Sequence, residues 1–157
     1  MTISSEQRPG ARVLALDVGK KRIGLAVSDE LGITAQGIET LKRSRIRDDL
    51  EELQRIVSRW NVEMLLVGKP LHMSGSESHQ SEYTSEFANR LSHHVGLPVV
   101  FWDERLTSAE AERLLKETGA SLEERRKAVD RMAAVLLLAS YLEYRRGTSQ
   151  AKDGPVG

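Results

Sequence analysis

The chain of 157 residues contains no cysteine, and this absence excludes several kinds of site at once. Without thiols there is no disulfide, no thiolate nucleophile and no zinc ribbon. Aromatic residues make up only 4% of the chain, which gives little support to recognition by base stacking. No apolar run approaches the ~20 residues of a membrane-spanning helix, and the start of the chain lacks the apolar segment of a secretory signal. We expect a cytoplasmic protein that does not enter a membrane.

The chain also lacks an excess charge of either sign, with 23 basic and 23 acidic residues. Bulk electrostatics therefore does not indicate a nucleic-acid partner. The charges are nevertheless clustered: residues 20–22, 42–47 and 125–127 are basic, whereas 48–52 and 109–112 are acidic. A balanced chain can present a local positive surface, although each cluster taken alone is equally typical of a solvated face.

Hydrophobic periodicity predicts an α/β fold in one domain over residues 12–146, between a flexible N-terminus (1–11) and a disordered tail (147–157). We expect strands over 12–18, 22–29, 33–41, 62–68 and 97–104, and helices over 46–60, 82–93, 107–116 and 121–144, with a loop over 69–80. The first three strands would form an antiparallel meander, and the later ones would alternate with helices. This order predicts a mixed five-stranded sheet flanked by helices.

Asp17 is the unusual residue of the first expected strand, which from Val13 to Val18 is otherwise apolar on both faces. An ionised carboxylate in such a strand is costly unless it is paired or binds a metal. Alternatively, Asp17 lies at the wet end of the strand and caps the turn at Gly19, because Asp and Gly often mark turns.

Two further acidic positions stand in separate segments. Asp103 and Glu104 end the last expected strand, and because adjacent strand residues point to opposite sides, at most one of them can face Asp17. Alternatively, one of them forms a surface pair with Arg105. Asp130 lies inside the last expected helix, on the apolar face that should meet the sheet. Alternatively, that helix begins at Asp130, which then serves as its N-cap.

Taken together, two strand ends and one helix position could converge at one edge of the sheet. Carboxylates that close together repel each other, and a divalent cation relieves the repulsion. Mg²⁺ or Mn²⁺ would suit such oxygen ligands, and metal ions of this kind support hydrolysis of phosphodiester bonds.

Four segments in this order resemble the YqgF family of Holliday-junction-resolvase-like proteins, also called pre-16S rRNA nucleases. They are LALDVGKKRIGLAVSD (14–29), LLVGKP (65–70), DERLTS (103–108) and VDRMAA (129–134). The resemblance covers about residues 12–146 and implies an RNase H-like fold. It implies that Asp17, Glu104 and Asp130 hold the metal and are catalytic, with Asp103 beside Glu104 as a further catalytic candidate. Many RNase H-like enzymes carry a fourth acid near the last one, and here no Asp or Glu follows Asp130 until Glu143.

Basic residues near these acids are candidates for holding the phosphate backbone. Lys20, Lys21 and Arg22 follow Asp17 in a glycine turn that is otherwise typical of a solvated hairpin. The other candidates adjoin the remaining motifs: Lys69, Arg105, Lys127 and Arg131.

The resulting hypothesis is a metal-dependent nuclease, a monomer or a homodimer, acting on structured nucleic acid. The substrate would be an RNA precursor, as in maturation of the 5′ end of pre-16S rRNA, or branched or single-stranded DNA. Two alternatives remain: a non-catalytic nucleic-acid-binding module in transcription or ribosome assembly, and a fragment of an actin-like ATP-dependent kinase. The first would need the basic clusters without the acids, and the second would need another lobe.

Overall fold

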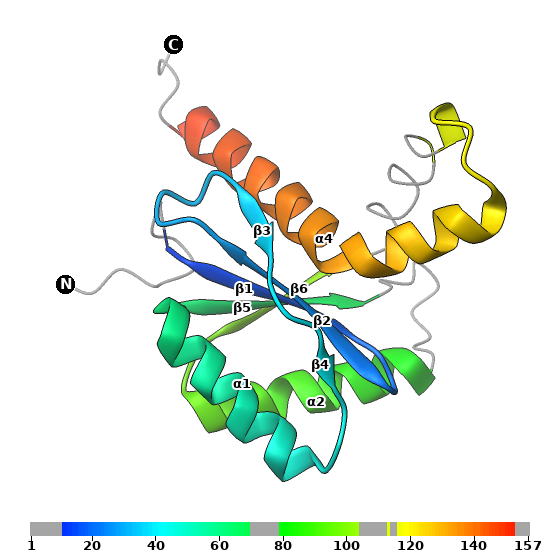
Figure 1. Ribbon diagram of the computed structural model, residues 1–157. Helices are drawn as coiled ribbons and strands as arrows, with labels where there is room; N and C mark the ends of the chain where they lie inside the picture. The colour runs from blue at the N-terminus through cyan, green and yellow to red at the C-terminus, as the bar shows by residue number, and fades with distance from the viewer. Residues whose placement is uncertain (1–10, 70–78, 104–112, 114–115, 153–157) are drawn as a thin grey trace.

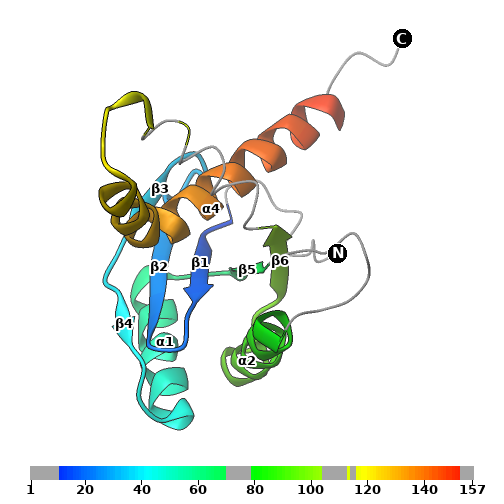
Figure 2. The ribbon, with the colours of Figure 1, turned by 90° about the vertical axis from the view of Figure 1, so that its right-hand side faces the viewer.

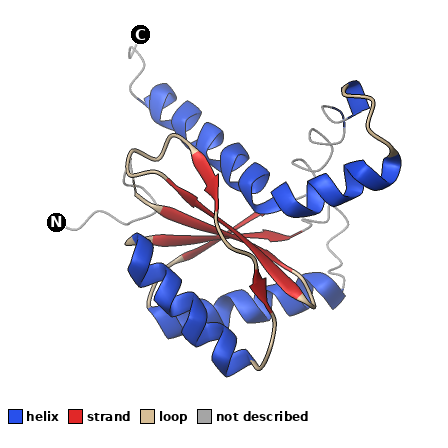
Figure 3. Ribbon diagram, viewed as in Figure 1, coloured by secondary structure: helices blue, strands red, loops and turns tan. Residues whose placement is uncertain are grey.

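The chain forms a mixed β-sheet with helices on both faces (Figure 3). The computed structural model describes residues 11–69, 79–103, 113 and 116–152. Within these residues the strands are β1 (Val13–Val18), β2 (Arg22–Ser28), β3 (Ala35–Gly37), β4 (Leu41–Lys42), β5 (Met64–Lys69) and β6 (Val99–Asp103). The order is β3-β2-β1-β5-β6, antiparallel from β3 to β1 and parallel from β1 to β6. The predicted fold class is confirmed.

The helices divide between the two faces of the sheet (Figures 1 and 2). α1 (Ile46–Trp60) and α2 (His79–Val95) cover one face, and α4 (Leu122–Lys152) crosses the other. Strand β1 is buried from both sides: Leu14 and Leu16 pack in the core under α1 and α2. Val13 and Ala15 pack in the core under α4. Apolar residues on both faces of the first strand are thus explained by its central place in the sheet.

The third expected strand is the main difference from the prediction, because the structure divides it into β3 and β4 and the sheet has six strands rather than five. Both short strands pair with β2. Ile38 and Leu41 pack against the same core under α1 and α2, although they are three residues apart. A regular strand would turn such residues to opposite faces, so the strand is interrupted between them.

The helices begin and end largely where periodicity places them. α1 has the expected bounds, and α2 extends the expected 82–93 by a few residues at each end. A capping box stands before α4, where the Ser121 hydroxyl accepts a hydrogen bond from the Glu124 amide at 3.2 Å. α4 continues to Lys152, into the segment expected to be a tail, because a single Gly147 does not stop a helix and no proline occurs before Pro155.

Several expectations fall mostly outside the described residues: the flexible N-terminus (1–11), the loop over 69–80, the helix over 107–116 and the last residues of the tail. Among the helices that are described, none has the length and apolarity required to cross a membrane.

Candidate functional site

Asp17 lies near the carboxyl end of β1 and on the face that α4 covers. It alternates with Val13 and Ala15, which pack against α4, and its side chain is partly buried. A Cβ atom added to Gly24, its partner on β2, would lie 3.6 Å from the Cβ of Asp17 and 3.8 Å from the Cβ of Ala134. Asp17 and α4 therefore meet above Gly24.

Glycines flank Asp17 on both neighbouring strands. Gly24 is its cross-strand partner on β2, and Gly68 stands one residue beyond the last parallel pair, Leu16 with Val67, on β5. Neither neighbour places a side chain beside the carboxylate. At this end of β1, the neighbouring strands therefore contribute only backbone beside Asp17.

Asp103 lies on the opposite face of the sheet from Asp17. Trp102, the residue before it, packs in the core under α4, whereas Phe101 packs in the core under α1 and α2. Alternation along β6 places Asp103 on the Phe101 side. Glu104 lies outside the described residues.

Lys69 shares the face of Asp103, its register partner across β5 and β6. The Lys69 ammonium lies 3.0 Å from the hydroxyl of Ser85 on α2 and 4.5 Å from the centre of the Phe101 ring. Its charge is therefore directed toward α2 and away from the face of Asp17.

The remaining predicted residues can be placed only along the chain. Asp130, Lys127 and Arg131 belong to α4, and Asp130 precedes Ala134 by four residues, about one turn. Their side chains, like Glu104 and Arg105, lie outside the described part. Among the side chains that are described, no group of three acidic or histidine residues could hold a metal. Asp17 is the one predicted metal ligand whose surroundings are visible.

The basic turn after Asp17 is tight and exposed. The Gly19 amide donates to the Arg22 carbonyl oxygen at 2.9 Å, and a Cβ atom at Gly19 would lie only 2.8 Å from that oxygen, so glycine is required here. Lys20, Lys21 and Arg22 are exposed, and none forms an ion pair with a carboxylate of the described chain. Three cations thus stand next to Asp17 without an acidic partner among the described residues.

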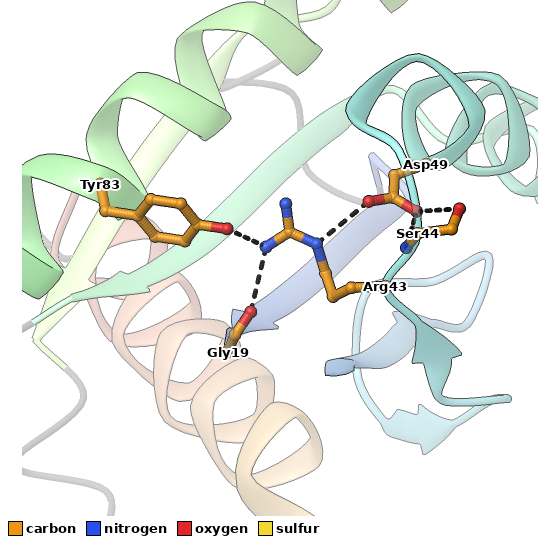
Figure 4. A network of polar contacts seen from close by, with 5 residues as sticks. All are labelled: Gly19, Arg43, Ser44, Asp49 and Tyr83. Atoms are coloured by element: carbon orange, nitrogen blue, oxygen red, sulfur yellow. Dashed lines mark hydrogen bonds and ion pairs between the residues drawn. The ribbon is translucent and has the colours of Figure 1, made fainter. Parts of the chain in front are cut away.

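A polar network centred on Arg43 and the buried Asp49 contacts the backbone of this turn (Figure 4). Arg43 follows β4, and its side chain bonds to the Gly19 carbonyl oxygen at 3.0 Å, to the Asp49 carboxylate at 3.1 Å and to the Tyr83 hydroxyl. Asp49 also accepts a hydrogen bond from the Ser44 amide at 3.0 Å, just before α1. No pattern in the sequence indicates this network, because Arg43 and Asp49 belong to charge clusters that are typical of a surface.

Trp102 has a structural role. Its indole nitrogen donates to the Ser140 hydroxyl at 3.2 Å, and its ring meets the Tyr141 ring edge-on at 5.3 Å. These contacts attach the last strand of the sheet to α4, so the ring is engaged within the protein and is not a platform for a base.

The fold is shared with solved resolvase structures. The structure described as "T. thermophilus RuvC in complex with Holliday junction substrate" matches with a TM-score of 0.55 over 88% of this chain and 97% of that chain, at 19% identity. A second Thermus thermophilus RuvC structure matches with a TM-score of 0.53 over 87% of this chain and 97% of that chain, at 17% identity. At this level of identity the likeness shows the RNase H-like fold.

Sequence comparison defines the family. The family described as "RuvX: Holliday junction resolvase" matches residues 11–144. The protein named "Putative pre-16S rRNA nuclease" of Koribacter versatilis is 51% identical over 136 residues, 87% of this chain and 88% of the relative. A relative of the same name in Carboxydothermus hydrogenoformans is 43% identical over 134 residues, 85% of this chain and 97% of the relative. The chain belongs to this family of nucleases, also called YqgF, and the resemblance seen in its motifs is confirmed.

Proposed function

We propose that the protein is a metal-dependent nuclease that hydrolyses phosphodiester bonds in structured nucleic acid. Family membership supports the nuclease activity. The observation that carries the metal site is Asp17, a partly buried carboxylate at the sheet edge with glycine on both sides and α4 beside it. Its ligand partners in this proposal are Glu104 and Asp130.

Glu104 is preferred to Asp103 as the strand-end ligand because Asp103 lies on the other face of the sheet. Carboxylate oxygens suit Mg²⁺ or Mn²⁺, and a bound ion would supply a Lewis acid and a metal-bound water for in-line displacement. The exposed cations of the turn, Lys20 and Lys21 foremost, would hold the phosphate backbone beside Asp17. Arg105, Lys127 and Arg131 would extend this contact.

The proposed substrate is the precursor of 16S rRNA at its 5′ end, and branched DNA is the second candidate. The names of the relatives support the first, and the family description supports the second. We place the activity in the cytoplasm, where bacterial rRNA precursors mature. Cutting a precursor RNA needs only a monomer, whereas symmetric cutting of a four-way junction needs a homodimer.

The test is cleavage of a labelled RNA that carries the 16S 5′ extension and of a labelled four-way DNA junction, with Mg²⁺, with Mn²⁺ and with a chelator. The Asp17→Asn protein, purified in parallel, controls for contaminating nucleases. We expect metal-dependent cleavage of at least one substrate by the wild type alone. Binding without cleavage under every condition would instead identify a non-catalytic nucleic-acid-binding module.

A further inference from the structure

We propose that Arg43 is a positioning residue for phosphate binding: it fixes the backbone of the turn that carries Lys20, Lys21 and Arg22. The inference rests on the proposed function, because the turn is taken to hold nucleic acid next to Asp17. Arg43 itself is separated from Asp17 in the sequence and belongs to none of the motifs of the site.

Arg43 holds the turn through two backbone carbonyl groups. Its guanidinium donates to the Gly19 oxygen at 3.0 Å, and its main-chain amide donates to the Lys21 oxygen at 2.9 Å. Inside the turn, the Gly19 amide closes on the Arg22 oxygen at 2.9 Å. The backbone that carries the three cations is thus held by hydrogen bonds from Arg43 and by one hydrogen bond within the turn.

The guanidinium is itself held rigidly. The Arg43 side chain is 10% exposed, and its partner Asp49 is 1% exposed. The guanidinium carbon lies 4.7 Å from the centre of the Phe87 ring and 5.5 Å from the centre of the Tyr83 ring, both on α2. Figure 4 shows the Tyr83 side chain beside Arg43. Through Arg43, the turn is therefore attached to both helices of this face.

Rigid support of the turn matters because its three cations are exposed. Binding a phosphate costs the conformational freedom of the groups that make the contact, and a fixed backbone has already lost part of it. Only a planar guanidinium can reach Gly19, Asp49 and Tyr83 together, since a lysine offers its donors from a single point. Arg43→Lys therefore keeps a positive charge beside Asp49 and loses the simultaneous hydrogen bonds to Gly19, Asp49 and Tyr83.

The experiment compares Arg43→Lys with Arg59→Lys, a matched exchange at an exposed arginine that pairs with Glu39 at 3.1 Å. Binding of a labelled four-way DNA junction and a labelled RNA duplex is measured without divalent metal. We expect Arg43→Lys to weaken binding by about tenfold, the loss of roughly one charge-assisted contact, and Arg59→Lys to leave it unchanged. Circular dichroism verifies that both variants are folded.

A double-mutant cycle separates positioning from direct contact. Arg43→Lys is repeated in a protein whose turn residues Lys20, Lys21 and Arg22 are all changed to alanine. Because Arg43 acts through these cations, we expect it to have no further effect there. Additive losses would mean that Arg43 binds phosphate itself, and they would overturn the inference.

Hydrogen exchange tests the same inference without nucleic acid. We expect the Gly19 amide to exchange about tenfold faster in Arg43→Lys, while amides of β5 keep their rates. An unchanged Gly19 rate would overturn the inference. If the wild type bound neither probe, the proposed function would fail, and the exchange rates would still decide whether Arg43 positions the turn.

Discussion

At the scale of single residues, the proposed metal site depends first on the carboxylate of Asp17. We expect Asp17→Asn to lower the cleavage rate by at least about a hundredfold, because the amide keeps the shape and loses the charge that holds a divalent ion. The free energy of unfolding should change by less than about 1 kcal/mol, since the substitution is nearly isosteric. Cleavage rate and melting temperature, measured on one preparation, check both expectations.

The matched control for Asp17 is Asp29, whose carboxylate accepts hydrogen bonds from the Ile33 amide at 2.7 Å and the Thr34 amide at 3.2 Å in the turn after β2. Asp29→Ala should lose stability and keep its cleavage rate. If Asp17→Asn likewise lost stability and kept its cleavage rate, Asp17 would be a turn residue and the proposed metal site would be refuted.

Asp29 also predicts a pH dependence of stability. Burial acts to raise its pKa, but backbone amides, those of Ile33 and Thr34 first among them, outweigh burial and lower the pKa below its ordinary 3.8. A lowered folded pKa adds stability that is complete above the ordinary value and is lost as the pH falls through the folded one. Asp29→Ala should therefore lower the free energy of unfolding at neutral pH and lower it progressively less below about pH 4. Solvent screening keeps the effect small, because this turn is exposed. Urea unfolding across this pH range measures the difference in free energy of unfolding between the wild type and Asp29→Ala. A difference that does not change with pH would contradict the lowered pKa of Asp29.

At the scale of elements, periodicity was a good guide wherever one face of a segment is buried. Leu50, Leu53 and Ile56 recur at helical spacing in α1, and they are the residues that pack on the sheet. The division of the third strand into β3 and β4 was not predicted, because tertiary packing draws Ile38 and Leu41 to one core against the alternation of a strand.

The site was predictable only in part, for a physical reason. Strand alternation already implied that only one of Asp103 and Glu104 can face Asp17. Which of the two does so depends on the face of the sheet to which each residue of β6 points, and the sequence alone does not show this. The pairing of Arg43 with Asp49 could not be predicted, because each lies in a charged run and burial of such residues is set by the elements around them. The convergence of Glu104 and Asp130 with Asp17 stays a prediction.

The hairpin of β1 and β2 offers a matched pair of glycine substitutions. A Cβ atom at Gly19 would lie 2.8 Å from the backbone oxygen of Arg22, whereas one at Gly24 would make ordinary contacts at 3.6 Å and 3.8 Å. Gly19→Ala should cost about 1–3 kcal/mol, because the turn must open. Gly24→Ala should be neutral or stabilising by about 0.4–1 kcal/mol, because it restricts the unfolded chain.

Midpoints of urea unfolding measure both glycine variants, and junction binding measures the turn. We expect Gly19→Ala to weaken binding as well, because the cations move with their backbone, and Gly24→Ala to keep it. Equal effects of the two changes on stability would contradict the geometry of the turn.

At the scale of the whole molecule, α4 runs along the face of the sheet on which Asp17 lies. Its middle packs on the sheet through Ala134, Leu138 and Leu142, and the Arg145 guanidinium donates to the Ala11 carbonyl oxygen at 3.4 Å, before β1 begins. The helix thus runs against β1 from the end near Asp17 to the opposite end. A metal ion held by Asp17 and Asp130 would bridge β1 and α4 directly.

Such a bridge predicts that metal binding stabilises the fold. An ion that binds only the folded chain adds RT ln(1 + [L]/Kd), about 2.7 kcal/mol at a hundredfold excess over Kd. We expect the melting temperature of the wild type to rise with Mg²⁺ or Mn²⁺ and that of Asp17→Asn to stay level. Asp29→Ala should begin lower and rise as much as the wild type, because its carboxylate serves a turn away from the ion. An equal rise of the melting temperature in Asp17→Asn would mean that the ion binds elsewhere, whatever the effect of the substitution on cleavage. In hydrogen exchange, protection of α4 amides that appears with metal and depends on Asp17 would show that one ion contacts both β1 and α4.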